Sequence, residues 1–374
     1  MKKELQIKEE DRRKQLIGEI IEYINEGFDL YIWGANSYGD SLTKYLKENG
    51  IKKDIIYVVD DEYFDKITQN AEKQIISLST YLENYSEKSV MIFGFYNYEI
   101  IKKKRAKYGD KIKHLYDFHM TVIDDRRLEW NAKFIKDNLA EFNHTYTMFE
   151  DEKSRQTMQL YLNAATAGEF EELYENCHED VAYFNDLTKE VNVKTLLDCG
   201  AYDGDSIHDF IQGFPNYEQI YAFEPDSSNV YKIHQREKNE NIRNLTVIEK
   251  GVYSETKELY FEAEGKSSSH LTEQGEIRIQ VMKLDELKEQ ISDHAMIKMD
   301  IEGSELEALN GARELIRQKK PCLSICVYHK EEDMITIPQY IESIVEKGTY
   351  KYYLRFHGLD LAELVFYAIP SDIA

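Results

Sequence analysis

The sequence predicts an α/β fold with two Rossmann-like parts, because twice along the chain an apolar, strand-like run leads through glycine into a helix. The first run is Asp29–Trp33 and the second is Thr195–Cys199. Residues about 122–190, between the two parts, are polar and have no proline, which favours helices. We therefore expect a Rossmann-like domain at residues 1–121, a helical linker and cover at 122–190, and an α/β domain at 191–374.

The amino-terminal part predicts alternating strands and helices. After the first strand we expect strands at Ile55–Val59 and Ser89–Phe93, and helices at 40–48 and 98–104. The turn after the first strand contains Gly34 and Gly39 but lacks both the dinucleotide glycine pattern and the Walker lysine. The sequence leaves two roles open for this domain. It could bind a nucleotide or nucleotide-sugar, or it could have a structural or acceptor-positioning role.

The linker predicts helices that pack against the carboxyl-terminal domain. Apolar residues recur among polar ones at 157–173, which indicates one amphipathic helix. The aromatic pair Tyr183 and Phe184 follows it. These rings either cover a cofactor pocket or belong to the core.

The loop after Thr195–Cys199 predicts a cofactor site. Its glycines allow close backbone approach, and Asp205 and Ser206 are candidate N-caps for a helix at 207–211. An acidic loop disfavours phosphate but suits the sulfonium and ammonium of S-adenosylmethionine, with Asp198 and Asp203 toward the methionine end. The predicted cofactor-binding residues here are Asp198, Gly200, Ala201, Tyr202, Asp203 and Gly204.

Two later segments extend this predicted site. Glu224 ends an apolar run and lies 20 residues after Gly204, where a second parallel strand would present a carboxylate to the ribose hydroxyls. A third strand ends near Gly251 and Val252, which we place beside the adenine.

A fourth strand, Ala295–Met299, predicts a catalytic edge. Period-two alternation places Lys298, Asp300 and Glu302 on one side, at the carboxyl end where open α/β sheets bind ligands. Ser304 and Glu307 have the spacing of a capping box, which would start a helix at 305–318.

A fifth strand at 322–329 would bring His329 to the same edge as Asp300. Either His329 or Asp300 could accept a proton. Lys298 could instead form a structural ion pair with Asp300 or Glu302, and His329 could be an ordinary strand-end histidine. Cys322 and Cys326 share one face of this strand and fit the core better than a ligand site.

The carboxyl-terminal half resembles the FkbM family of methyltransferases. The matching motifs are LDCGAYDGD at 197–205, AFEPD at 222–226, KMDIEGSEL at 298–306 and NGA at 310–312. The resemblance covers about residues 155–372 and implies a class I methyltransferase sheet, which would end in an antiparallel hairpin at 353–357 and 364–370. Cys199 stands where the family often has Val, and Tyr202-Asp203 replaces a loop that more usually contains Asn.

Membership of this family implies S-adenosylmethionine-dependent methyl transfer, usually to a hydroxyl of a sugar, glycan or other natural product. The predicted catalytic residues are Asp300, His329, Lys298 and Glu302. Asp300 and Glu302 could alternatively bind a divalent cation, but the predicted site includes no metal.

Composition limits the partners and the location. The formal net charge of −23 disfavours nucleic acid and anionic membranes as acceptors, so we expect a small molecule or a glycan. Four cysteines without a C-x-x-C pair suggest a reducing compartment, and no apolar run reaches the ~20 residues that span a bilayer. These features predict a cytoplasmic protein. The sequence leaves its oligomeric state open.

Two other functions fit the same sequence. One is a nucleotide-dependent oxidoreductase or sugar-modifying enzyme that uses the amino-terminal domain. The other is a non-catalytic binding protein that retains the fold.

Overall fold

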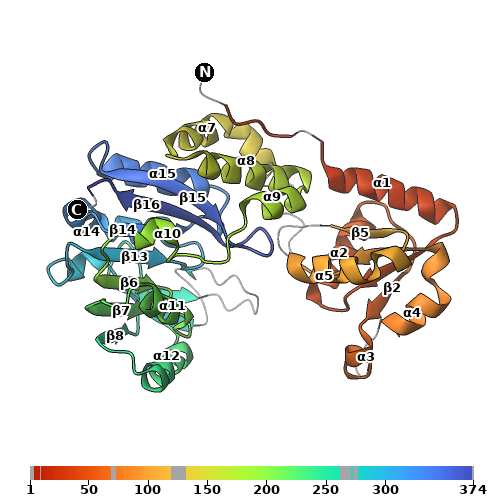
Figure 1. Ribbon diagram of the computed structural model, residues 1–374, viewed down its shortest axis with the longest axis horizontal. Coiled ribbons are helices and arrows are strands. Elements are labelled where there is room, and N and C mark those ends of the chain that lie inside the picture. Colours follow the sequence, from red (N-terminus) through yellow and green to blue (C-terminus); the bar gives the residue numbers. More distant parts are fainter. Residues whose placement is uncertain are drawn as a thin grey trace.

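The computed structural model describes residues 4–8, 10–68, 73–118, 132–261, 271–272 and 277–372. Two largely parallel sheets lie at opposite ends of the molecule, and a group of helices lies beside the larger sheet, on the side of the amino-terminal domain (Figure 1). The α/β class is therefore confirmed. The expected boundary between residues 121 and 122 lies outside the described residues.

The amino-terminal sheet has the strand order β3-β2-β1-β4-β5, and its neighbouring strands are parallel. Its strands are β1 (Asp29–Trp33), β2 (Ile55–Val59), β3 (Ile75–Ser77), β4 (Ser89–Phe93) and β5 (Leu115–Asp117). Its helices are α1 (Arg12–Asn25), α2 (Ser37–Glu48), α3 (Asp61–Thr68), α4 (Leu78–Asn84) and α5 (Tyr98–Tyr108), with short 3₁₀ turns η1 (Ser86–Lys88) and η2 (Gly109–Lys111). The predicted Rossmann-like arrangement is present, with two three-residue strands that the sequence pattern did not reveal.

The glycines of the amino-terminal turn bring backbone segments close together. A Cβ atom on Gly34 would lie 2.5 Å from the carbonyl oxygen of Gly94, and one on Gly39 would lie 2.1 Å from that of Gly34. Close packing on the turn after β4 therefore accounts for Gly34, and close packing within the turn after β1 accounts for Gly39.

The helices of the predicted linker are α7 (Leu139–Met148), α8 (Glu152–Ala167), α9 (Phe170–Cys177) and α10 (Asp186–Lys189). The single helix expected at 157–173 is wrong. Gly168 ends α8 in the left-handed conformation (φ +73°), and α9 starts two residues later.

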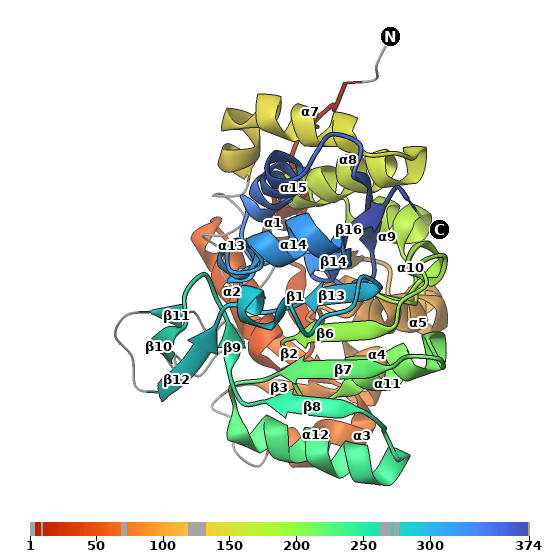
Figure 2. The same cartoon turned by 90° about the vertical axis from the view of Figure 1, so that its left-hand side faces the viewer.

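The carboxyl-terminal sheet has the order β15-β16-β14-β13-β6-β7-β8 (Figure 2). Its strands are β6 (Thr195–Cys199), β7 (Gln219–Phe223), β8 (Leu245–Ile248), β13 (Ala295–Met299), β14 (Cys322–Cys326), β15 (Tyr350–Phe356) and β16 (Leu364–Pro370). β16 is antiparallel to both neighbours, which confirms the expected final hairpin, and the other pairs are parallel. β14 ends at Cys326, so His329 lies in the loop after it and not on the strand as expected.

The remaining helices are α11 (Asp205–Gly213), α12 (Ser227–Glu240), α13 (Glu305–Asn310), α14 (Arg313–Lys319), α15 (Asp333–Ile344) and the 3₁₀ turn η3 (Leu284–Leu287). A small second sheet consists of β9 (Gly251–Val252), β10 (Lys257–Phe261), β11 (Leu271–Thr272) and β12 (Ile277–Met282). The helix expected at 305–318 is two helices. The break lies at Gly311, where a Cβ atom would come within 2.0 Å of the carbonyl oxygen of Tyr253.

The hydrophobic core is continuous between the two large sheets. One cluster of buried side chains includes Trp33 and Phe93 of the amino-terminal sheet, Phe170 of α9 and Ile297 of β13. Cys322 and Cys326 are fully buried in a second cluster beside α11, as expected for core residues. Among the described helices, none combines the length and apolar character needed to cross a bilayer.

Candidate active site

The loop after β6 is held against the end of β13 by backbone contact. Gly200 has φ +77°, and a Cβ atom there would lie 2.0 Å from the carbonyl oxygen of Asp300. The amide of Asp300 in turn donates to the carbonyl oxygen of Cys199 (3.1 Å). Glycine at position 200 therefore allows both the positive φ and the contact between the two strand ends.

Beneath this loop lies a buried ion pair between Asp198 and Lys298. Their side chains are 3.1 Å apart, and the Lys298 ammonium also donates to the carbonyl oxygen of Gly200 (2.7 Å). Burial alone would lower the pKa of Lys298, but the negative charge of Asp198 raises it above the usual value. The partner is thus Asp198, and the alternative pairing of Lys298 with Asp300 or Glu302 is wrong.

Ser206 completes the surroundings of Asp198 and changes the expected start of the helix. Its hydroxyl donates to the second carboxylate oxygen of Asp198 (2.6 Å), so it does not cap a helix. α11 already begins at Asp205, with Gly204 (φ +86°) at the N-cap position and no side-chain cap. The N-cap role predicted for Asp205 and Ser206 is therefore wrong.

Glu224 follows β7 and contacts the loop after β6. One carboxylate oxygen accepts from the amide of Tyr202 (3.0 Å), and the other accepts from the amide of Asp226 (2.9 Å). Burial raises the pKa of Glu224, while these amides oppose the shift. The structure thus brings together the glycine loop and the carboxylate that were 20 residues apart in sequence.

The other loop residues have distinct positions. Ala201 is buried in the core, whereas the ring of Tyr202 is 57% exposed. Asp203 forms an ion pair with Arg236 of α12 (3.2 Å).

Gly251 and Val252 lie in the small sheet beyond this loop. They form β9, which pairs with β12, and Val252 is buried. The end of β8 connects Gly251 and Val252 to Glu224, because the carbonyl oxygen of Ile248 accepts from the amide of Glu224 (3.2 Å). The turn before Gly251 therefore lies beside the end of β7.

Asp300 lies at the carboxyl end of β13 among hydroxyl groups. Its carboxylate accepts from Tyr183 (3.0 Å) and from Tyr328 (3.3 Å). The expected alternation stops here because β13 ends at Met299 and Glu302 has a left-handed backbone (φ +56°). Lys298 consequently points into the buried ion pair, while the Glu302 side chain is about half exposed.

His329 lies between three carboxylates. Its Nδ1 is 2.9 Å from Glu305, and its Nε2 is 3.4 Å from Asp300 and 3.7 Å from Glu302. Burial alone would lower the pKa of His329, but the contact with Glu305 and the nearby negative charges raise it to about 9. The structure therefore confirms that His329 reaches the same edge as Asp300.

Glu305 is a site residue that the sequence pattern assigned to a helix start. Its Oε1 accepts from the amide of Ile301 (2.9 Å), and its side chain is fully buried. Ser304 makes no side-chain capping bond, so the predicted capping box is wrong. The sequence signal for this residue was a glutamate at the first position of the helix, and the predicted capping box did not point to it.

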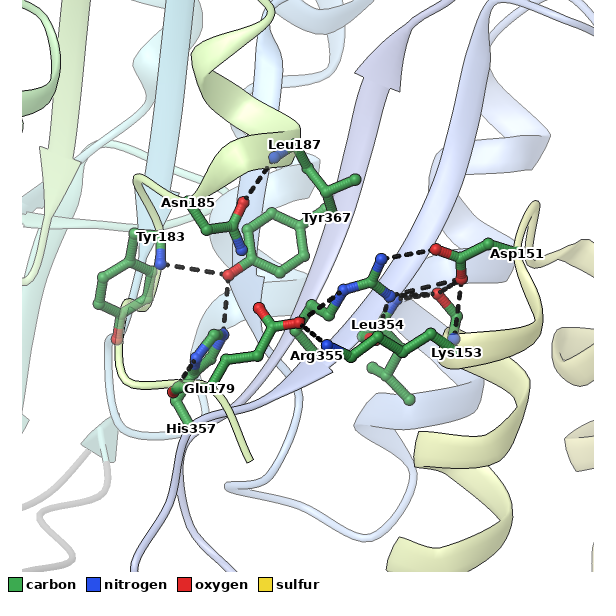
Figure 3. Close-up of polar contacts among 11 residues, drawn as sticks. Asp151, Lys153, Glu179, Tyr183, Asn185, Leu187, Leu354, Arg355, His357 and Tyr367 are labelled. Carbon is green, nitrogen blue, oxygen red and sulfur yellow. Dashed lines mark hydrogen bonds and ion pairs between the residues drawn. The ribbon is translucent and has the colours of Figure 1, made fainter. Parts of the chain in front are cut away.

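Tyr183, whose hydroxyl donates to Asp300, is held by contacts with the final hairpin. Figure 3 shows these hairpin contacts. The amide of Tyr183 donates to the hydroxyl of Tyr367 (3.1 Å), which also contacts His357 (3.0 Å). Just before it in the chain, Glu179 pairs with Arg355 of β15 (3.3 Å). Of the aromatic pair singled out in the sequence, Tyr183 thus reaches the site and Phe184 is core.

The carboxyl-terminal domain has a class I methyltransferase fold, with the glycine loop and Glu224 at the carboxyl ends of adjacent parallel strands. Residues 198–352 match the family model described as the methyltransferase FkbM domain. The family model therefore confirms, over these residues, the resemblance seen in the motifs.

A solved structure shares this fold over most of the chain. Methyltransferase FkbM from Methylobacillus flagellatus KT has a TM-score of 0.70 and 24% identity, over 93% of this chain and 92% of that one. A putative methyltransferase from Streptococcus mutans in complex with SAH has a TM-score of 0.32 and 13% identity, over 49% of this chain and 93% of that one. No match was found among curated protein sequences.

Proposed function

We propose that the protein is an S-adenosylmethionine-dependent methyltransferase acting on a hydroxyl group of a sugar, glycan or other natural product. The observation that carries the proposal is the contact between Glu224 and the loop at Gly200–Gly204, made by the amide of Tyr202. A carboxylate fixed by backbone amides at this edge has lone pairs left for the two ribose hydroxyls of a nucleoside.

The residues present fit this cofactor. Glu224 is largely buried, and hydroxyl donors would compensate the burial that raises its pKa. Gly200 lets the loop pack closely on the end of β13, and Tyr202 offers an exposed ring beside the loop. We assign Asp198 and Lys298 to holding the loop, because their charged groups are bound to each other and to Gly200.

The bound cofactor would supply an electrophilic methyl group on a sulfonium. The acceptor oxygen forms the new C–O bond as the C–S bond breaks, sulfur keeps the electron pair, and a base takes the hydroxyl proton. We assign that proton to Asp300 or His329 at the carboxyl end of β13, where His329, with its pKa raised to about 9, would accept it only in its neutral form. Tyr183 and Tyr328 orient the Asp300 carboxylate through their hydroxyls.

The acceptor we propose is a small molecule or a glycan. The net charge of −23 supports this assignment, since polyanions such as nucleic acid and anionic membranes would be repelled. The four cysteines are unpaired and buried, which supports a reducing, cytoplasmic location.

The proposal is tested by ligand binding to the full chain. S-adenosylhomocysteine should raise the Tm. Glu224→Gln should weaken its binding about tenfold or more, because the variant lacks the carboxylate that would accept from both ribose hydroxyls. Glu249→Gln, in the turn next to Glu224, serves as a control with unchanged binding. Stabilisation by a nicotinamide cofactor but not by S-adenosylhomocysteine would overturn the proposal in favour of an oxidoreductase.

Catalysis is tested separately with methyl-labelled S-adenosylmethionine and a panel of glycans and nucleotide-sugars. Mass spectrometry should detect transfer to a hydroxyl group. Tight cofactor binding without transfer to any hydroxyl compound would contradict the proposed acceptor class.

A further inference from the structure

We propose that His329, Asp300 and Glu305 form a binding site for a divalent first-row transition-metal ion at the carboxyl end of β13. One ligand atom from each of these residues lies within 4.8 Å of the other two. The inference goes beyond the proposed methyl transfer and departs from the metal-free site predicted from the sequence.

The separations of these groups are close to those of ligands that share one ion. An imidazole binds one ion through one of its two nitrogens, and one such nitrogen of His329 lies within 4.8 Å of a carboxylate oxygen of Asp300 and of Glu305. Two ligands about 2.1 Å from an ion with a tetrahedral angle between them are about 3.4 Å apart. Small side-chain rotations would therefore bring the three groups around one ion.

A buried oxygen of Glu305 gives an independent indication of a ligand. Glu305 is fully buried, and in the part of the chain that the structure describes its Oε2 has no hydrogen-bond partner. A carboxylate oxygen buried in this way costs free energy unless it is paired or coordinates a metal. A cation between Glu305, Asp300 and His329 would satisfy it.

The local charge also favours a cation. Glu302 lies 3.7 Å from His329 Nε2, so that three carboxylates surround one imidazole. Because Glu302 is about half exposed, a hydrated ion can reach the group from solvent on this side.

The donor types select the class of metal. Imidazole favours Zn²⁺, Fe²⁺ or Co²⁺, and carboxylates also suit Mn²⁺, whereas Mg²⁺ prefers oxygen ligands alone. An ion at this position, next to the glycine loop, would lower the pKa of an acceptor hydroxyl that it binds. The site would thus assist deprotonation of the acceptor.

The test is Co²⁺ binding to the chelator-treated full chain, followed by visible absorption and by metal analysis. We expect one Co²⁺ per chain, displaced by Zn²⁺ or Mn²⁺ and at least tenfold less readily by Mg²⁺. His329→Gln and Glu305→Gln should each weaken Co²⁺ binding tenfold or more. His208→Gln, which removes a partly exposed histidine 2.7 Å from Glu240, is the matched control and should leave binding unchanged.

Circular dichroism and Tm identify any variant that fails to fold, and Asp300→Asn then provides a further measurement of the same site. The interpretation in which a protonated His329 forms only an ion-pair network predicts no saturable Co²⁺ binding, or equal binding by wild type and folded His329→Gln. Either result would overturn the metal site. S-adenosylhomocysteine binding is measured in the same samples, so that failure of the metal site and failure of the proposed function are distinguishable.

Discussion

At the scale of single residues, Gly200 determines whether the loop after β6 can adopt its position. An alanine in a left-handed backbone costs about 1–2 kcal/mol. Gly200→Ala should lower the free energy of unfolding by more than this, because its Cβ would also meet the Asp300 carbonyl oxygen at 2.0 Å. Urea unfolding checks this prediction. Gly348→Ala is the matched control, since Gly348 has φ +85° and, among the described residues, no atom outside its chain neighbours lies within 4 Å of the added Cβ. Equal costs for the two variants would contradict the role of the contact.

The buried pair of Asp198 and Lys298 leads to a second prediction. Lys298→Met should lower the free energy of unfolding by about 3–5 kcal/mol, because it leaves the charge of Asp198 buried without its partner. The double variant Asp198→Leu/Lys298→Met should recover most of that loss. Unfolding in urea measures both. A double variant less stable than Lys298→Met would show that the ion pair is not the source of the effect.

Sequence reasoning identified single residues better than their partners. Gly200 and Glu224 were found because the pattern of strand, glycine turn and distant acid reflects local geometry. The pairing of Lys298 with Asp198 was missed, because alternation along a strand gives the face of a side chain and not its neighbour on the next strand. The hydroxyl of Tyr183 reaches Asp300 across 117 positions, a contact that no local pattern contains.

At the scale of elements, the ends of helices differed most from prediction. The helices expected at 157–173 and 305–318 are each interrupted at a glycine, Gly168 and Gly311. Apolar periodicity continues across both interruptions, so it could not reveal them. Gly168 has a left-handed backbone, and Gly311 packs on a backbone carbonyl. Both causes depend on conformation and tertiary contact.

The contact between α8 and β15 leads to a prediction for acid conditions. Asp151 caps α8 and pairs with Arg355 of β15 (2.5 Å). Burial alone would raise the pKa of Asp151, but hydrogen bonds from Arg355 and Ser154 hold it below its usual value of 3.8. The folded state therefore binds this proton less tightly than the unfolded state. Its stabilising contribution is complete above pH 3.8 and is lost as the pH falls through the lower folded value.

Asp151→Asn keeps a capping side chain but removes the charge. The difference in free energy of unfolding between wild type and Asp151→Asn should be constant from about pH 7 to 5 and should shrink below about pH 4. Urea unfolding at a series of pH values measures it. A difference that stays constant down to pH 3 would exclude the ion pair as its source.

At the scale of the whole molecule, the shared core predicts that both α/β parts unfold together. Tyr98 of α5 is buried against Phe170 and Tyr174 of α9, with ring centroids 5.5 and 4.8 Å away. Tyr98→Ala should cost about 3 kcal/mol or more and lower the Tm of a single calorimetric transition. Tyr96→Ala, at a position 58% exposed, should change stability by no more than about 0.5 kcal/mol. Two transitions, of which only one shifts, would contradict a shared core.

The helices beside the carboxyl-terminal sheet have a consequence for self-association. β15 is an edge strand, but the segments flanking α8 and α9 pair with it in parallel bridges, Phe149 with Tyr352 and His178 with Phe356. These bridges occupy backbone groups that could otherwise recruit a strand from a second molecule. Growth of the sheet into an intermolecular ribbon is therefore blocked along much of β15, and the opposite edge, at β8, is where such growth would have to begin.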